Sequence, residues 1–217
     1  MTFQAAEVDH YVVDHAAAQH HHQVLTEMEA RAAAGGFPIV GRAVGRHLEL
    51  AARSIGARRV VELGSGFGYS AYWFARAVGD DGEVICTDGD PAHATSAEGF
   101  LRRAELWDRV RFEVGDALTV LAGLEGEFDV VYCDVDKDGY PDVWAAAAER
   151  IRIGGLYVCD NVLWDGRVAG LDLPAEPERD EVTGAIAAHN RAVATDPRFV
   201  SSILPIRDGV LVALRIE

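Results

Sequence analysis

Short apolar runs alternate with segments of helical periodicity along most of the chain. The runs lie at residues 59–63, 84–88, 110–114, 128–134 and 156–160, and the helical segments include 70–78, 92–103 and 140–150. Strands this apolar are buried on both faces, which is typical of a parallel sheet covered by helices. The pattern therefore predicts a doubly wound α/β fold, in which ligands bind at the carboxyl ends of the strands.

The pattern changes near the C-terminus. A helix is predicted over about 178–195, and two apolar runs at 200–204 and 210–216 flank a turn-like segment at 205–209. A connection this short joins antiparallel strands. We therefore expect a mostly parallel sheet with an antiparallel C-terminal hairpin at its edge.

The chain divides into an alanine-rich, helical-looking region at residues 1–57 and the alternating strands and helices of residues 58–217. Because 49% of the 217 residues are hydrophobic and no Pro/Gly/Ser-rich linker divides them, we expect a single domain. His20, His21 and His22 are consecutive, but successive helical residues point about 100° apart and cannot converge on one ion. We interpret them as a solvated face or part of a lid rather than a metal site.

Composition narrows the partners and the compartment. The formal net charge of −15 argues against nucleic acid and anionic membranes, whose phosphates need clustered Lys and Arg. We expect neither a membrane span nor a signal peptide, because no apolar run is long enough and no basic start precedes an apolar stretch. A cytoplasmic protein is predicted. Cys86, Cys133 and Cys159 fall inside predicted strands, and we interpret them as buried core residues rather than disulfides or metal ligands.

A glycine-rich turn follows the first predicted strand. Gly64, Gly66 and Gly68 precede a helix, and glycine permits both a tight turn and a close approach of backbone to ligand. The first N–H groups of that helix can bind the anionic end of a cofactor. Tyr69 stands where a dinucleotide-binding fingerprint has glycine, which disfavours a pyrophosphate cofactor. An ordinary strand-to-helix turn is the alternative interpretation.

Acids follow the next two strands. Asp88 ends the second strand, where a carboxylate can accept hydrogen bonds from ribose hydroxyls. Asp116 follows the third strand and could meet an adenine amino group. Either acid alone could be a helix cap or a surface residue. In this order after the glycine turn, they indicate an adenosine pocket.

A second constellation follows the fourth and fifth strands. Asp134, Asp160 and Asn161 supply two carboxylates and an amide oxygen, a hard oxygen site suited to Mg²⁺. Lys137 is the only lysine of the chain, and a lysine, unlike an arginine, can give up its proton. Capping roles for the acids and a solvated loop position for the lysine are the alternatives.

Several motifs together resemble the cation-dependent class I O-methyltransferases, the family that contains catechol O-methyltransferase and caffeoyl-CoA O-methyltransferase. The likeness runs from about residue 38 to the C-terminus. Its marks are residues 61–70, Phe128-Asp129, residues 134–140, Gly154-Gly155, residues 160–164, Asn190, residues 196–198 and residues 204–209. The resemblance implies a Rossmann-like methyltransferase fold and, because relatives commonly form one, a homodimer.

The resemblance also implies roles for individual residues. It places S-adenosylmethionine against Val40, Glu62, Gly64, Ser65, Gly66, Ser70, Asp88, Gly115, Asp116, Ala117 and Asp134. It assigns a divalent cation, most simply Mg²⁺, to Asp134, Asp160 and Asn161. Lys137 would be the general base, and Asp134 would share in catalysis.

The function expected from the resemblance is methyl transfer to a hydroxyl of a metal-chelated, catechol-like small phenol. The acidity of the chain favours such a phenol over a polyanionic CoA thioester. A metal-independent methyltransferase acting on another small acceptor and a non-catalytic S-adenosylmethionine-binding module are the alternatives. The departures from the family fall mainly in the N-terminal fifty or so residues. Residues 165–179, which we expect to form a loop over the site, are equally uninformative about the acceptor. Whether Lys137 is charged stays open, because nearby acids favour the ammonium while burial and a metal favour the amine.

Overall fold

The computed structural model describes residues 6–18, 22–171 and 173–217. Its sheet contains the strands β1 (Arg59–Leu63), β2 (Glu83–Asp88), β3 (Val110–Val114), β4 (Phe128–Cys133), β5 (Ile151–Cys159), β6 (Phe199–Leu204) and β7 (Val210–Arg215). The order across the sheet is β3-β2-β1-β4-β5-β7-β6. The first five strands are parallel, and β7 pairs antiparallel with both β5 and β6. The predicted doubly wound sheet with an antiparallel C-terminal edge is therefore confirmed.

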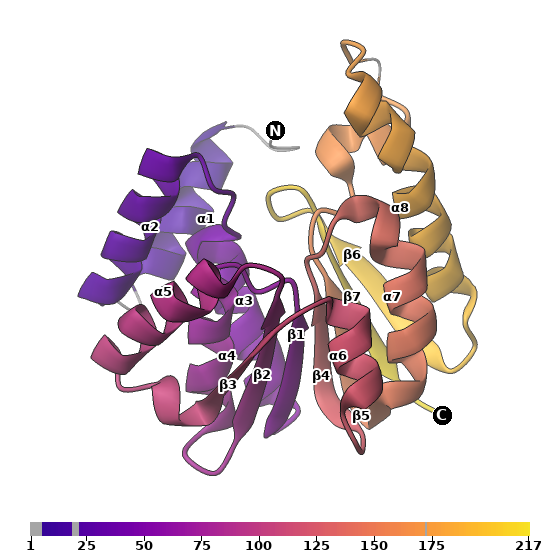
Figure 1. Ribbon diagram of the computed structural model, residues 1–217. Helices are drawn as coiled ribbons and strands as arrows, with labels where there is room; N and C mark the ends of the chain where they lie inside the picture. Colours follow the sequence, from indigo (N-terminus) through magenta and orange to yellow (C-terminus); the bar gives the residue numbers. More distant parts are fainter. Residues whose placement is uncertain (1–5, 19–21, 172) are drawn as a thin grey trace.

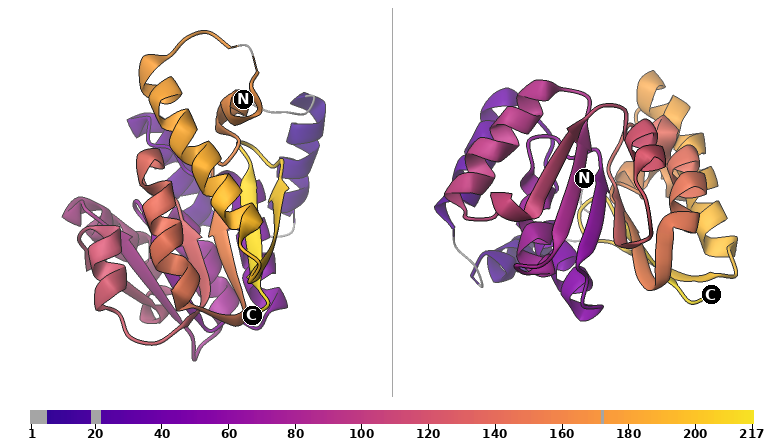
Figure 2. Two further views of the ribbon diagram at one scale, coloured as in Figure 1. Left: turned by 90° about the vertical axis from the view of Figure 1, so that its right-hand side faces the viewer. Right: turned by 60° about the horizontal axis from the view of Figure 1, so that its bottom comes forward.

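Helices cover both faces of this sheet (Figures 1 and 2). They are α1 (Ala6–Ala18), α2 (Gln23–Gly35), α3 (Gly41–Ser54), α4 (Tyr69–Val78), α5 (Pro91–Arg103), α6 (Ala117–Gly123), α7 (Tyr140–Ala147) and α8 (Pro177–Thr195). Short 3₁₀ segments are η1 (Trp107–Arg109), η2 (Lys137–Gly139), η3 (Ala148–Arg150) and η4 (Trp164–Ala169). Figure 1 shows α2 to α5 on one side of the sheet and α6 to α8 on the other.

Each central strand divides its side chains between two apolar cores. Val130 and Tyr132 pack in the core under α2 to α5, whereas Val131 and Cys133 pack in the core under α6 to α8. This alternation follows from the two-residue repeat of a strand and explains why the strands are apolar throughout. Cys86, Cys133 and Cys159 are buried free thiols, as expected.

The start of β5 differs from the sequence-based expectation. The strand begins at Ile151 rather than near residue 156, and its pairing with β4 shifts register before Leu156. Gly154, with φ of +78°, and Gly155 lie at this irregularity, where a Cβ on Gly155 would come within 2.9 Å of the Asp129 carbonyl oxygen. The glycines interrupt the apolar pattern and concealed the first part of the strand.

The N-terminal helices belong to the same core as the sheet. Leu25 of α2 and Leu48 of α3 are buried in the cluster that also contains Val60 of β1 and Trp73 of α4. His22 precedes α2 and caps it, its Nδ1 accepting from Val24 N at 3.2 Å. His20 and His21 lie outside the described residues. Within the described ranges, no helix has the length and apolar character needed to cross a membrane.

Candidate active site

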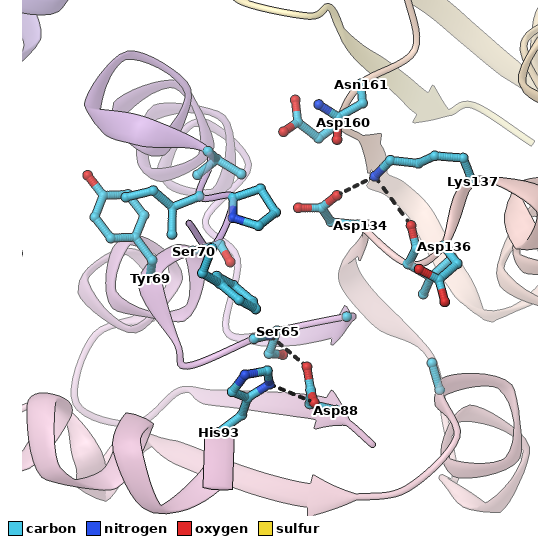
Figure 3. A pocket seen from close by; sticks show the side chains of 18 of the residues that line it. Ser65, Tyr69, Ser70, Asp88, His93, Asp134, Asp136, Lys137, Asp160 and Asn161 are labelled. Carbon is cyan, nitrogen blue, oxygen red and sulfur yellow. Dashed lines mark hydrogen bonds and ion pairs between the residues drawn. The ribbon is translucent and has the colours of Figure 1, made fainter. Parts of the chain in front are cut away.

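A cleft of about 920 Å³ opens at the carboxyl ends of the parallel strands. The loops after β1 to β5 line it, together with residues 37–40 and the turn between β6 and β7. The sheet order turns about β1, because β2 lies on one side and β4 on the other, and ligands bind at such a switch point. In Figure 3 the Asp134, Lys137 and Asp160 side chains lie close together, and Asp88 and His93 lie together in another part of the cleft.

The glycine turn brings the loops after β1 and β4 into contact. Asp134 N donates to Leu63 O at 2.8 Å. Gly64 has φ of +84°, and a Cβ there would stand 2.3 Å from the Asp134 carbonyl oxygen. Only glycine combines this backbone conformation with so close an approach. Gly68 then precedes α4 without a side-chain cap, so the first N–H groups of this helix have no side-chain acceptor at the cap position, and Tyr69 and Ser70 of the same turn line the cleft.

Asp88 is held at the end of β2 by three hydrogen bonds, of which Figure 3 shows the one to His93. Its Oδ2 accepts from Gly66 N at 3.0 Å, its Oδ1 accepts from Asp90 N at 2.8 Å, and His93 Nδ1 lies 2.9 Å from the same Oδ1. A carboxylate offers about four acceptor positions. Asp88 is thus fixed in place and keeps acceptor capacity for a ligand hydroxyl.

Asp116 is a helix cap that also lines the cleft. Its Oδ1 accepts from Thr119 N at 2.8 Å and from the Thr119 hydroxyl at 2.7 Å. These hydrogen bonds hold the pKa of the Asp116 carboxyl below its usual value. The capping alternative is therefore realised, while Gly115, Asp116 and Ala117 also form part of the cleft wall.

Glu62 lies behind the cleft wall rather than on it. It is fully buried, and neither carboxylate oxygen has a hydrogen-bond partner among the described residues. Burial raises the pKa of Glu62 to about 7. The Ser70 and Ser65 hydroxyls are close enough to oppose this rise in part, although they lie outside hydrogen-bonding geometry.

Lys137 and Asp134 form an ion pair on the opposite wall. The Lys137 Nζ donates to Asp134 Oδ1 at 2.8 Å and to Val135 O at 3.3 Å. Burial lowers the pKa of Lys137, but the charge of Asp134 and its hydrogen bond raise that pKa by more, so it stands above its ordinary value. In the ligand-free protein Lys137 is therefore an ammonium.

Asp160 faces the same space with an unsatisfied oxygen. The residue is 4% exposed, and its Oδ1 has no hydrogen-bond partner in the described part of the chain. Burial, and next the negative charge of Asp134, raise the pKa of Asp160 to about 7. Asn161 follows in the left-handed region with φ of +54°, a conformation that Asn tolerates better than most residues.

Hydrogen bonds from two helices fix the loop that carries Asp160 and Asn161. The Tyr140 hydroxyl, at the start of α7, donates to Asp160 O at 2.8 Å. Asn190 of α8 donates through Nδ2 to Val162 O at 2.8 Å. These two hydrogen bonds thus fix the backbone at Asp160 and at Val162, on either side of Asn161.

The residues present fit a hard divalent cation. An orphaned buried carboxylate oxygen on Asp160, repelled by Asp134, is a site that a cation would satisfy. The donor atoms of Asp134, Asp160 and Asn161 are oxygens, as Mg²⁺ prefers. Across residues 6–18, 22–171 and 173–217 there is no cluster of three or more His, Cys, Asp or Glu side chains arranged for a metal. The candidate set is therefore two carboxylates and an amide.

The segment expected to be a loop over the site is tied into the fold. The Arg179 guanidinium lies 4.2 Å from the Trp164 ring centroid and pairs with Asp165. Trp164 Nε1 donates to Arg179 O at 2.9 Å, and Asp165 N donates to Asp208 Oδ1 at 2.5 Å. Trp164, Asp165 and Arg179 line the cleft beside Asp160, so the two ends of this segment form part of the wall of the site.

Comparisons with known proteins agree with this geometry. A family model described as O-methyltransferase matches residues 13–216. This chain belongs to the O-methyltransferase family. It is an S-adenosylmethionine-dependent enzyme of class I, and the expected recognition and fold are confirmed.

Individual relatives show how much of the chain is shared. A caffeoyl-CoA O-methyltransferase from Eucalyptus gunnii is 31% identical over 179 residues, which cover 80% of this chain and 72% of the relative. A catechol O-methyltransferase from Niastella koreensis is 34% identical over 167 residues, covering 74% and 75%. The solved structure of an O-methyltransferase from Bacillus cereus in complex with SAH has a TM-score of 0.83 and 28% identity, covering 96% of this chain and 97% of that one.

The structure gathers nearly all of the predicted site residues of this methyltransferase. Those on the cleft wall are Val40, Gly64, Ser65, Gly66, Ser70, Asp88, Gly115, Asp116, Ala117, Asp134, Lys137, Asp160 and Asn161. Glu62 alone of the predicted set lies behind it.

Sequence reasoning missed Phe37, His93, Arg179 and Arg207 as lining residues. His93 lies in the first turn of the helix after Asp88, a position that points back to the strand end, so a signal for it existed. Phe37 and Arg207 come from loops whose placement depends on tertiary packing. Arg179 lies in the first turn of α8, at the end of the segment that we expected over the site.

Proposed function

We propose that this methyltransferase transfers the methyl group of S-adenosylmethionine to a hydroxyl of a vicinal dihydroxy aromatic small molecule. The observation that carries the proposal is the meeting of Asp134, Lys137, Asp160 and Asn161 beside the glycine turn in one cleft. Cofactor and acceptor would then lie in contact, as an in-line displacement requires. Relatives named for catechol and for caffeoyl-CoA support a phenolic acceptor.

The cofactor is proposed to lie along the loops after β1, β2 and β3. Asp88 offers acceptor capacity to ribose hydroxyls, and residues 115–117 flank the adenine. The uncapped start of α4 at Tyr69 and Ser70 would receive the carboxylate of the methionine part. Glu62 is buried behind this wall, so its carboxyl group would interact electrostatically with the amino group of the methionine part without lying on the cleft surface.

Asp134, Asp160 and Asn161 are proposed to hold a divalent cation, most simply Mg²⁺. When bound, such a cation lowers the pKa of a hydroxyl that it ligates and fixes a chelating diol in one orientation. Tyr140 and Asn190 keep the Asp160–Asn161 backbone in place for this role through their hydrogen bonds.

Lys137 is proposed to accept the proton of the reacting hydroxyl. In the ligand-free protein its ammonium is stabilised by Asp134, so it must first release its own proton. Any loss of negative charge on Asp134 reduces that stabilisation and lowers the pKa of Lys137. The side chain touches the cleft and no other described carboxylate lies within ion-pairing distance of its Nζ.

A small phenol is proposed in preference to a CoA thioester. The part of the cleft around Lys137 and Trp164, where the acceptor would bind, has several acidic side chains that would repel a polyanion. They are Asp134, Asp136, Asp160, Asp165 and Asp208. We also propose that residues 1–217 act as one domain, since α2 and α3 share the core of the sheet. The homodimer stays a prediction.

The test is methyl transfer from S-adenosylmethionine to a panel of catechols and caffeoyl esters, read by product mass with Mg²⁺ and then with a chelator. The proposal expects product from vicinal diols with Mg²⁺ and its disappearance with chelator. Product that persists with chelator would indicate a metal-independent enzyme. Tight cofactor binding with no product from any acceptor would indicate a binding module.

A further inference from the structure

Arg207 stands in the turn between β6 and β7 with an unusual backbone conformation. Its φ is +51°, in the left-handed region that residues other than glycine rarely adopt. The residue lines the cleft. Strained positions of this kind persist where the surrounding structure holds them, and they concentrate at functional sites.

The side chain joins the C-terminal hairpin to the N-terminal part of the chain. Its Nη1 donates to the Ile39 carbonyl oxygen, and a Cβ on Gly41 would come within 3.3 Å of the same nitrogen. In Figure 1 the turn between β6 and β7 reaches toward the N-terminal helices, in agreement with this contact. Arginine has five N–H donors, so a single hydrogen bond leaves most of the guanidinium for a ligand.

Arg207 differs from the other cationic side chains of the cleft wall in lacking an acidic partner. His93 lies against Asp88, Lys137 against Asp134, and Arg179 against Asp165. Within the described ranges, no carboxylate lies within 4.0 Å of the Arg207 guanidinium. The cleft therefore presents one positive group whose charge is not already neutralised by a direct contact.

The position of this charge is at the acceptor side of the cleft, which we define by Asp160, Asn161, Lys137 and Trp164. The residues next to Arg207 in its turn bind the loop that follows Asp160 and Asn161: Leu163 N donates to Asp208 O at 2.9 Å, and Val162 N donates to Gly209 O at 3.2 Å. A ligand group that meets Arg207 would thus belong to the molecule bound near Asp160.

We propose that Arg207 is a specificity-determining residue that binds a carboxylate substituent of the aromatic acceptor. Arginine suits this role because its planar fork binds a carboxylate through two parallel hydrogen bonds. The inference rests on the proposed function and deepens it by naming the acceptor class as an acidic dihydroxy aromatic. The methionine carboxylate of the cofactor has the uncapped first turn of α4 available instead.

A matched pair of acceptors tests the proposal: a vicinal dihydroxybenzoate and its neutral methyl ester. The wild type is compared with Arg207→Gln, which removes the charge, Arg207→Lys, which keeps a charge without the fork, and Arg207→Gly, which also relieves the positive φ. Arg102→Gln is the matched control, since Arg102 lies on α5, pairs with Glu98 and is absent from the cleft wall. The readouts are kcat/KM for each acceptor and, by calorimetry, binding of each acceptor and of S-adenosylhomocysteine.

The wild type is expected to prefer the acid over the ester. Both uncharged variants should lower the acid-to-ester ratio about tenfold to a hundredfold, the range for a charge-assisted hydrogen bond, with an intermediate loss for Arg207→Lys. Arg207→Gly guards against misfolding, because glycine suits this backbone. The affinity for S-adenosylhomocysteine should change less than about twofold.

Two results would overturn the proposal. The first is an equal loss for acid and ester together with weakened S-adenosylhomocysteine binding, which would assign Arg207 to the cofactor carboxylate. The second is an acid-to-ester ratio that is the same in wild type and variants. If no acceptor is methylated at all, the proposed function fails, but acceptor binding still decides whether Arg207 selects the acid.

Discussion

Lys137 Nζ lies 2.8 Å from Asp134 Oδ1, so the candidate base and a candidate metal ligand form a single ion pair. The pair explains why the sole lysine of the chain is charged without ligands, since Asp134 outweighs the effect of burial on the pKa of Lys137. It also couples proton release by Lys137 to the charge state of Asp134. Cation binding by Asp134 and proton transfer by Lys137 are thus linked, because these two side chains contact each other.

Replacing Lys137 separates these roles. Lys137→Ala should lower kcat by about 10² to 10⁴, the usual contribution of a positioned base. Lys137→Arg should be nearly as slow, because arginine keeps the positive charge beside Asp134 but does not release its proton. Calorimetry should find S-adenosylmethionine affinity within about threefold of wild type in both. Wild-type turnover by Lys137→Arg would remove Lys137 from proton transfer.

Buried Glu62 predicts a pH-dependent cost to folding. Its pKa rises from an ordinary value of 4.5 to about 7 in the folded protein, so between these values the folded state keeps a proton that the unfolded state has lost. The free energy of unfolding should therefore fall as pH rises through this window, by on the order of 3 kcal/mol from this residue. Glu62→Gln should remove that part of the decline and be more stable than wild type at pH values above about 7.

Urea unfolding of the cofactor-free protein at a series of pH values checks this expectation. Glu125→Gln is the matched control, because Glu125 is exposed and its replacement should leave the wild-type pH profile in place. Asp160 contributes to the wild-type decline as well, since its pKa is also raised to about 7, so the difference between variants is the informative quantity. Identical profiles for Glu62→Gln and wild type would contradict the assigned burial effect.

Tyr140 predicts an effect on metal affinity without contact to the metal. Tyr140→Phe deletes the hydroxyl that holds Asp160 O and should weaken Mg²⁺ or Mn²⁺ binding about tenfold, as loss of a supporting hydrogen bond does at metal sites. Ser54→Ala is the control, because the Ser54 hydroxyl donates to Ala51 O at 2.7 Å on α3 and Ser54 is absent from the cleft wall. Both variants lose one hydrogen bond, but only Tyr140→Phe should change metal affinity in calorimetry. Equal metal affinities would show that the loop needs no such support.

Gly64 and Gly89 follow adjacent strands, and their replacement by alanine should affect stability differently. Gly64→Ala places a Cβ 2.3 Å from the Asp134 carbonyl oxygen at a positive φ and should cost at least about 2 kcal/mol of stability. Gly89→Ala meets nothing within 4 Å and should change stability by less than about 1 kcal/mol. Thermal unfolding of the two variants measures the difference. A Gly64→Ala protein as stable as Gly89→Ala would mean that the loops after β1 and β4 can move apart.

The parts of the fold that the sequence predicts are those set by local pattern. The apolar runs around Val61, Ile85 and Val131 reappear as buried parallel strands, because a strand with helices on both faces must be apolar throughout. The first residues of β5 escape this reasoning, since Gly154 and Gly155 break the run at an irregular pairing.

The same distinction holds for the site. Asp88, Asp116, Asp134 and Asp160 are predictable as a group because each follows a strand, and strand ends of a parallel sheet meet at one edge. The burial of Glu62 and the hydrogen bond from Tyr140 to the Asp160 loop depend on packing between elements, so the local sequence pattern does not predict them. Arg207 lies in a recognisable turn, yet its place on the cleft wall follows only from the way the hairpin meets residues 39–41.

The central claim is that this methyltransferase acts on a diol held by a cation at Asp134, Asp160 and Asn161. Its most direct test titrates chelator-treated enzyme with Mg²⁺ and measures methyl transfer to a vicinal dihydroxybenzene and to the isomer whose hydroxyls are not adjacent. The account predicts a rate that saturates with Mg²⁺ for the vicinal diol and negligible product from the isomer. Equal methylation of both isomers, or a rate that is independent of Mg²⁺ and chelator, would contradict it.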